Sequence, residues 1–165
     1  MGQNLHPFPG FTASVCHLRP ESRGSIHLRS ADPGQSPSIR VNYLSTDEDR
    51  RAVVDGLKFL RSIMQAPAML DYASEEIEPG PACASNQDLL AYCRAKGSTI
   101  YHPSGTCRMG VDPGAVVSPD LKVKGLSGLR VADGSIMPQL VSGNTNAAII
   151  MIGEKASDLI LGESL

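Results

Sequence analysis

Two segments in the last third of the chain carry the residue types best suited to chemistry. The first, residues 101–110, reads Tyr-His-Pro-Ser-Gly-Thr-Cys-Arg-Met-Gly and is expected to place His102 at the end of an extended stretch. Pro103 and Gly105 turn the chain away directly after the histidine, so its side chain is expected to face a cleft. A neutral imidazole can accept a proton near pH 7. The segment therefore offers a candidate base, although a lone histidine is more often structural.

The second segment begins with an apolar stretch over residues 129–131, typical of a short strand, and continues into Asp133 and Gly134. In open α/β sheets, ligands bind beyond the carboxyl ends of strands. An aspartate there can accept hydrogen bonds from ribose-like hydroxyls, and a glycine lets a backbone N–H approach a phosphate. Asp-Gly is equally typical of a plain turn. Both interpretations stay open on this motif alone.

The same segment continues into a polar turn, residues 142–146 (Ser-Gly-Asn-Thr-Asn), before an apolar helix predicted at about residues 145–160. Any polar residue of the turn could simply cap this helix. Alternatively, the positive end of the helix dipole would stabilise an anionic cofactor, and Asn144 would hydrogen-bond a reacting hydroxyl. Taken with His102, this arrangement suits a redox site in which a base and a helix N-terminus face one cofactor.

The elements that must position these residues follow from periodicity and turn chemistry. A loop is expected over residues 1–15, and the cluster of Glu75, Glu76 and Glu78 is expected to form a solvated face. Strands or extended stretches are predicted at residues 14–18, 24–29, 38–43, 98–102, 116–123 and 129–131, and helices between Ser45 and Pro67, at Asn86–Lys96 and at residues 145–160. This order predicts an α+β fold whose last third has α/β character.

Composition excludes several classes of protein. A net charge of −2 and the absence of tryptophan over 165 residues disfavour nucleic-acid binding. The longest apolar run is far short of the roughly 20 residues of a transmembrane segment, and no signal peptide is visible. We therefore expect a cytoplasmic chain, with peripheral attachment to the inner membrane as an alternative. Four scattered cysteines are expected to be reduced, and a zinc site from Cys93, His102 and Cys107 lacks the usual ligand spacing.

Several motifs in the same order closely resemble the C-terminal region of glucose–methanol–choline (GMC) flavin oxidoreductases, nearest to the choline-dehydrogenase and alcohol-dehydrogenase branch. The matching segments are residues 22–33 (Ser-Arg-Gly-Ser-Ile-His-Leu-Arg-Ser-Ala-Asp-Pro), 42–44, 102–110, 129–138, 142–147 and 152–156. The resemblance runs from about Phe11 to Gly162. It implies an enzyme that oxidises a small-molecule primary alcohol to an aldehyde by hydride transfer to N5 of FAD.

The resemblance also implies roles for individual residues. His102 matches the active-site base and Asn144 its active-site partner. Asp133 and Gly134 match a segment near the FAD pyrophosphate and ribityl chain. The cofactor-binding set is completed by Asn144, Thr145 and Asn146, in the turn that meets the pyrimidine edge of the flavin.

The resemblance further implies how the chain is organised. Residues 1–100 would belong to a substrate-binding domain with a mixed or antiparallel sheet, and residues 101–165 would carry the catalytic segment and complete the FAD-binding domain. Family members are more than three times longer and begin with a dinucleotide fingerprint, which this sequence lacks. We expect a C-terminal fragment that is inactive without its N-terminal FAD-binding half. The alternatives are a non-catalytic stand-alone module or a split subunit completed by a separate chain.

Overall fold

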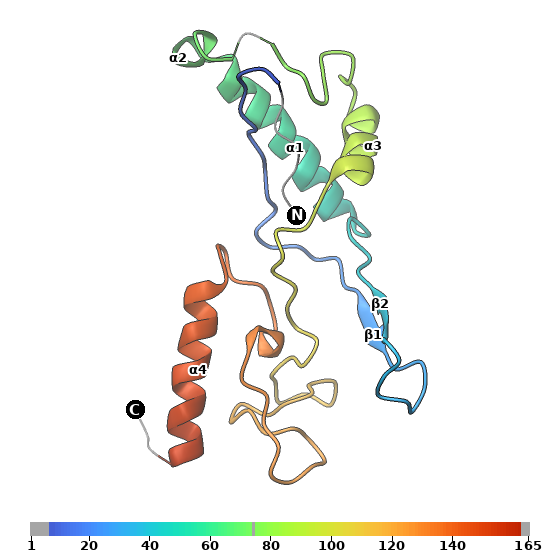
Figure 1. The fold of residues 1–165 in the computed structure, drawn as a ribbon, viewed down its shortest axis with the longest axis vertical. Coiled ribbons are helices and arrows are strands. Elements are labelled where there is room, and N and C mark those ends of the chain that lie inside the picture. Colours follow the sequence, from blue (N-terminus) through green and yellow to red (C-terminus); the bar gives the residue numbers. More distant parts are fainter. Residues whose placement is uncertain (1–6, 74, 163–165) are drawn as a thin grey trace. The chain divides into compact units, whose positions relative to one another are not determined.

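The computed structural model describes residues 7–73 and 75–162, so the first six residues of the loop expected over 1–15 lie outside it. Its elements are β1 (Ser25–His27), β2 (Ser38–Arg40), α1 (Asp47–Met64), α2 (Pro67–Leu70), α3 (Asn86–Lys96), the 3-10 helix η1 (Gly134–Ile136) and α4 (Asn146–Leu161), as Figure 1 shows. Helices with a small antiparallel sheet confirm the α+β class.

The chain packs as two units. One comprises Met1–His17 and Asp47–Gly97, and the other comprises Leu18–Thr46 and Ser98–Leu165. These units reflect packing within this chain. The division into residues 1–100 and 101–165 concerns the domains of a larger enzyme and stays a prediction.

The first unit is built on α3 packed against α1 (Figure 1). Their bounds confirm the helices predicted between Ser45 and Pro67 and at Asn86–Lys96. Val54 on α1 and Leu89 on α3 are buried, as helical apolar spacing requires. At the start of α3, the Ser85 hydroxyl accepts a hydrogen bond from the Asp88 N–H at 3.1 Å, and the Asp88 carboxylate accepts one from the Ser85 N–H at 3.1 Å. This capping box satisfies two N–H groups at the helix start.

In the acidic cluster after α1, Glu75 and Glu78 are exposed, as expected, whereas Glu76 is partly buried against Arg61. Arg61 of α1 donates from Nη2 to the Glu76 carboxylate at 2.8 Å and from Nε to both carboxylate oxygens. It also donates to the carbonyl oxygens of Cys83 and Gly80, at 2.8 and 3.1 Å. The Glu76 partner raises the pKa of Arg61. One guanidinium thus fastens the irregular segment between α2 and α3 to α1, because its fork can satisfy several acceptors at once.

The strand predicted over residues 14–18 is wrong, because this segment pairs with no strand among residues 7–73 and 75–162. Instead it runs along α1 within the first unit. Val15 lies so close to Gly56 that a Cβ at that glycine would collide with it. His17 Nε2 lies 3.4 Å from the buried Asp49 carboxylate. Contacts with a helix replace the strand pairing that alternation had suggested.

The second unit holds the hairpin of β1 and β2. Their antiparallel register pairs Ile26 with Ile39, which confirms strand character within residues 24–29 and 38–43. A Cβ at Gly24 would collide with the carbonyl oxygen of Arg40, so only glycine allows this close approach.

The core of the second unit lies between α4, η1 and the loops over residues 109–131. Its buried members are Val117, Leu121, Ile136, Met137, Ile152 and Ala156. The strands predicted over residues 116–123 and 129–131 are wrong as continuous strands, because only isolated bridges form there. The chain folds back at Leu121, whose φ of 66° lies in the left-handed region, and the Ser118 N–H donates to the Lys122 carbonyl at 2.9 Å.

Candidate active site

Backbone hydrogen bonds join the two chemically suggestive segments within the second unit. The Cys107 N–H donates to the Ser135 carbonyl at 3.0 Å, and the Met109 N–H donates to the Ile136 carbonyl at 2.7 Å. Gly105 has a φ of 84°, and a Cβ there would lie 3.2 Å from the Met137 carbonyl oxygen. Backbone hydrogen bonds therefore hold the loop that follows His102 against η1. This contact supports the prediction that the two segments act together.

His102 is half-buried, and its Nδ1 lies 3.0 Å from the carbonyl oxygen of Ile100. A carbonyl oxygen only accepts, so Nδ1 must carry the hydrogen in this contact, and Nε2 is left with the free lone pair of the neutral ring. The predicted extended stretch before His102 is corrected. Tyr101 has a φ of 63°, so the chain turns immediately before the histidine.

Asp133 differs from the prediction in that it begins a 3-10 helix instead of ending a strand. It is exposed, and its carboxylate accepts a hydrogen bond from the Ser135 N–H at 2.7 Å. The Ser135 hydroxyl and N–H hold the pKa of Asp133 below its usual range. A Cβ on Gly134 would lie 3.2 Å from Ile149 Cδ1, so this glycine lets η1 pack closely on α4. Turn formation and close packing thus account for Asp133 and Gly134 in this chain.

The N-terminus of α4 has no side-chain cap. Thr145 precedes the helix in a helical conformation, is buried, and makes no capping hydrogen bond. Asn144 and Asn146 are exposed on either side of it. The Ile149 N–H donates to the Thr145 carbonyl at 2.9 Å. The N–H groups of residues 146–148 therefore precede the first helical bond and are the donors that a helix start leaves open.

Sequence reasoning missed Arg19, which donates from Nε to the Ser142 hydroxyl in the turn before α4. These residues are 123 positions apart, and no local signal pairs them. This hydrogen bond holds the turn that carries Asn144 to a distant segment of the chain.

The residues described above can be compared with what a bound FAD would need. An uncapped helix start offers N–H donors to an anionic ring edge, and His102 offers a free ring nitrogen. These features fit the reactive end of a flavin. The sequence contains no glycine-rich phosphate loop, so the dinucleotide portion would need residues from elsewhere. Among the described residues, no hydrogen bond joins His102 to Asn144, and their closeness stays a prediction.

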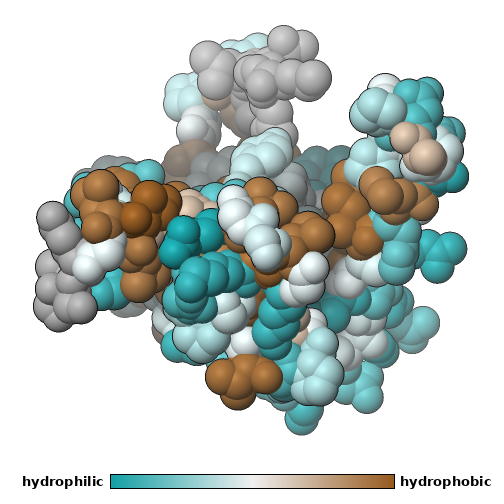
Figure 2. Space-filling view, turned by 90° about the horizontal axis from the view of Figure 1, so that it is seen from below, coloured by the Kyte–Doolittle hydropathy of each residue, from teal (hydrophilic) through white to brown (hydrophobic). Residues whose placement is uncertain are grey.

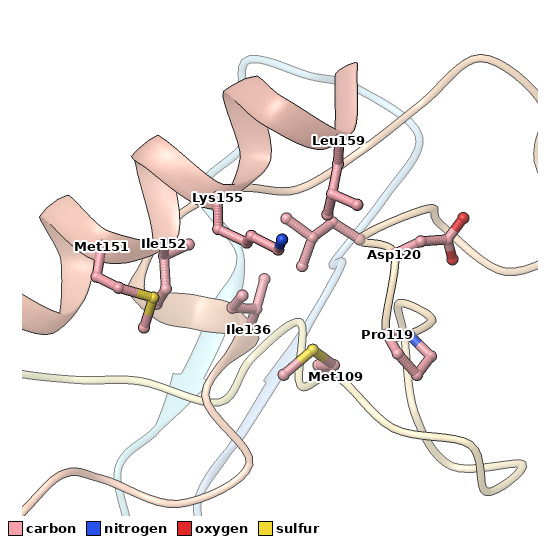
Figure 3. Close-up of a pocket in the computed structure, with 9 residues that line it drawn as sticks. Met109, Pro119, Asp120, Ile136, Met151, Ile152, Lys155 and Leu159 are labelled. Atoms are coloured by element: carbon pink, nitrogen blue, oxygen red, sulfur yellow. The ribbon is translucent and has the colours of Figure 1, made fainter. Parts of the chain in front are cut away.

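Beside α4 lies an open groove of about 380 Å³, drawn in Figure 3. Its lining is Met109, Pro119, Asp120, Leu121, Ile136, Met151, Ile152, Lys155 and Leu159. None of the predicted site residues lines it. Large apolar side chains of α4 are also exposed, namely Ile149, Ile150, Met151, Ile160 and Leu161. Figure 2 shows hydrophobic side chains gathered on this part of the surface.

Among residues 7–73 and 75–162, no three His, Cys, Asp or Glu side chains come together as metal ligands. None of the helices there combines the length and apolar character that crossing a bilayer demands.

Comparisons with known proteins agree on one family. The family described as GMC oxidoreductase matches residues 20–153. An alcohol dehydrogenase [acceptor] of Pseudomonas putida is 51% identical over 152 residues, which cover 92% of this chain and 28% of the relative. An oxygen-dependent choline dehydrogenase of Escherichia coli (strain UTI89 / UPEC) is 44% identical over 162 residues, covering 98% of this chain and 29% of the relative.

Solved structures show the same relationship. Pyridoxine 4-oxidase from Mesorbium loti aligns with a TM-score of 0.83 at 33% identity, over 90% of this chain and 29% of that one. A fungal aryl-alcohol oxidase aligns with a TM-score of 0.77 at 37% identity, over 88% of this chain and 24% of that one. This chain thus spans less than a third of the length of the relatives it matches.

Proposed function

The chain belongs to the GMC oxidoreductase family, and we propose that it is the base-carrying C-terminal portion of an FAD-dependent enzyme that oxidises a primary alcohol to an aldehyde. Two of its relatives are an alcohol dehydrogenase and a choline dehydrogenase, which supports a substrate with an alcohol group. In this proposal residues 1–100 form part of the substrate-binding domain, and residues 101–165 complete the FAD-binding domain.

One observation carries the proposal most directly, and it concerns His102. Its Nδ1 donates to the Ile100 carbonyl, so Nε2 is the nitrogen free to take the proton from a substrate hydroxyl. When bound, FAD supplies the acceptor for the hydride. His102 then has the task of removing the hydroxyl proton, and Asn144 that of hydrogen-bonding the same oxygen.

The start of α4 would face the pyrimidine edge of the flavin. Thr145 leaves the helix uncapped, and the exposed Asn144 and Asn146 flank it. Donors aimed at a developing negative charge lower the energy of the reduced flavin without reorganising. Asp133 and Gly134 would lie near the pyrophosphate and ribityl chain. The hydrogen bonds from Ser135, which hold the pKa of Asp133 below its usual range, favour its ionised form there.

The exposed apolar side chains of α4 and the groove beside it support a partner that covers them. A large contiguous apolar surface commonly marks an interface. We propose that the remaining FAD-binding part of a family enzyme, on the same or a separate polypeptide, packs there. The chain alone would then bind FAD weakly and show no turnover. The second candidate, a non-catalytic module, would leave this surface for a partner unrelated to flavin chemistry.

The test is a chimera in which this chain replaces the matching C-terminal region of the Pseudomonas putida relative. The purified chimera is expected to hold FAD, measured by its absorbance, and to oxidise primary alcohols. His102→Gln is expected to lower kcat by roughly 10²–10⁴-fold because the base is lost. His27→Gln in the exposed β1 strand is the matched control and should leave kcat unchanged.

Two results would contradict the proposal. Full alcohol oxidation by the His102→Gln chimera would remove the base assignment. Tight, stoichiometric FAD binding by the 165-residue chain alone would show that no further portion is needed. A chimera that folds and holds FAD but oxidises no alcohol would favour the non-catalytic module.

A further inference from the structure

The three residues before His102, Thr99–Tyr101, form a compact turn. The Tyr101 N–H donates to the Thr99 hydroxyl oxygen at 3.0 Å. Tyr101 has a φ of 63°, a left-handed conformation that is strained for a residue with a large side chain. A side-chain oxygen that accepts from the N–H two residues on is a recognised local turn for Ser and Thr.

Packing does not explain why Tyr101 keeps this strained conformation. The residue is 84% exposed, so no surrounding core fixes it. Within the part of the chain that the structure describes, the hydrogen bond to Thr99 is the only polar contact of the Tyr101 backbone. Strained backbone persists only where its surroundings hold it. The Thr99 hydroxyl is therefore the group that stabilises the turn.

The turn has a consequence for His102. It brings the Ile100 carbonyl oxygen to 3.0 Å from His102 Nδ1. Because that oxygen can only accept, the contact exists only for the ring form that carries its hydrogen on Nδ1. If the turn relaxed, the carbonyl would leave Nδ1, and the ring could move its hydrogen to Nε2.

We propose that Thr99 is a positioning residue that sets the tautomer of His102. Its hydroxyl holds the left-handed Tyr101, the turn presents the Ile100 carbonyl, and the carbonyl keeps the hydrogen on Nδ1 and the lone pair on Nε2. The use of that lone pair as a base rests on the proposed function, but the tautomer itself does not depend on it.

The experiment uses the 165-residue chain and two variants, Thr99→Val and Thr99→Ser. Valine keeps the shape of threonine and removes the acceptor, whereas serine keeps the acceptor. Nitrogen-15 NMR of the imidazole rings at alkaline pH distinguishes protonated from unprotonated ring nitrogens, and His102→Gln identifies the His102 signals. Exchange of the Tyr101 amide with solvent is measured in the same samples, with the α3 amides as a control for folding.

In the unmodified chain, Nδ1 of His102 is expected to give the signal of a protonated nitrogen and Nε2 that of an unprotonated one. Thr99→Val should move the two signals toward each other and speed Tyr101 amide exchange by roughly tenfold, the worth of one hydrogen bond. Thr99→Ser should match the unmodified chain. A hydrogen on Nε2 in the unmodified chain, or a Thr99→Val spectrum identical to it, would overturn the proposal.

The chimera separates this proposal from the proposed function. There Thr99→Val should lower kcat by roughly tenfold with little change in KM, and Thr99→Ser should restore it. If the NMR result holds and His102→Gln leaves activity intact, the tautomer is set as proposed but the base is elsewhere. If His102→Gln abolishes activity and Thr99→Val alters neither NMR nor kcat, only the role of Thr99 is overturned.

Discussion

The N-termini of α3 and α4 differ in whether their first backbone N–H groups have side-chain acceptors. At α3, Ser85 and Asp88 close a reciprocal capping box. At α4, Thr145 makes no capping bond and no acidic residue lies in the first turn. An N-terminal cap is usually worth about 1 kcal/mol to a helix, so α4 forgoes a stabilisation that α3 has.

The two helices also differ in what they show to solvent. The exposed side of α3 carries polar residues such as Arg94 and Lys96, whereas α4 exposes Ile150, Met151 and Leu161. A helix that is apolar on more than one face is usually buried on more than one face. The difference is that α3 is capped and polar toward solvent, while α4 has an open start and an uncovered apolar face. Both features of α4 support the proposal that this helix meets a cofactor and a further part of an enzyme.

The largest expected effect separates the two faces of α4. Ile152 is 7% exposed and belongs to the core of its unit, whereas Ile150 is 57% exposed. Ile152→Ala should lower the free energy of unfolding by roughly 2–5 kcal/mol, because it removes buried methyl groups and leaves a cavity. Ile150→Ala should change it by less than about 0.5 kcal/mol.

Urea unfolding of the two variants, followed by circular dichroism, measures both values. In the chimera Ile150 would be covered, so Ile150→Ala should also become destabilising. The difference between the two variants in free energy of unfolding should therefore be smaller there. Equal, large losses for both variants in the chain alone would show that α4 already has a partner on each face.

Sequence reasoning succeeded where the determinants are local. α1, α3 and α4 follow from apolar spacing and from stop signals such as Gly97, and the α3 capping box from two residues three apart. Residues 38–40 form a strand because the hairpin partner lies nearby in sequence. These features depend on few residues and short separations, which is why one sequence is enough to predict them.

The failures arise where distant contacts decide. Alternation predicts a strand over residues 14–18, but Val15 packs on Gly56 instead. Residues 116–123 look like one strand, yet Leu121 turns the chain into the core with a left-handed φ. The link between Arg19 and Ser142 joins segments that share no pattern. The same holds for the candidate site: its segments were proposed from the sequence and stay a prediction, but the turn at Tyr101 before His102 was not foreseen.

A smaller effect tests the two helix starts directly. Ser85→Ala should lower the free energy of unfolding by about 1 kcal/mol, because the Asp88 N–H loses its acceptor. Thr145→Val keeps the shape of a buried side chain that makes no capping bond, so it should change stability by less than about 0.5 kcal/mol. Chemical denaturation of both variants makes the comparison. A loss at Thr145 as large as that at Ser85 would mean that α4 is capped in solution.

The smallest effect concerns pH and again separates the two starts. The Ser85 hydroxyl and N–H hold the pKa of Asp88 below its usual range. A lowered pKa in the folded state means that the ionised carboxylate stabilises the fold above the unfolded value near 4, and that this contribution is lost as pH falls through the folded value. The stability advantage of the unmodified chain over Asp88→Asn should therefore be constant near neutrality and shrink below about pH 4.

Because the first turn of α4 has no acidic residue, Asn146→Ala should show a pH-independent difference over the same range. Thermal unfolding of the three proteins at matched pH values measures both differences, and a difference for Asp88→Asn that stays constant into strong acid would show that its charge does not support the capping box.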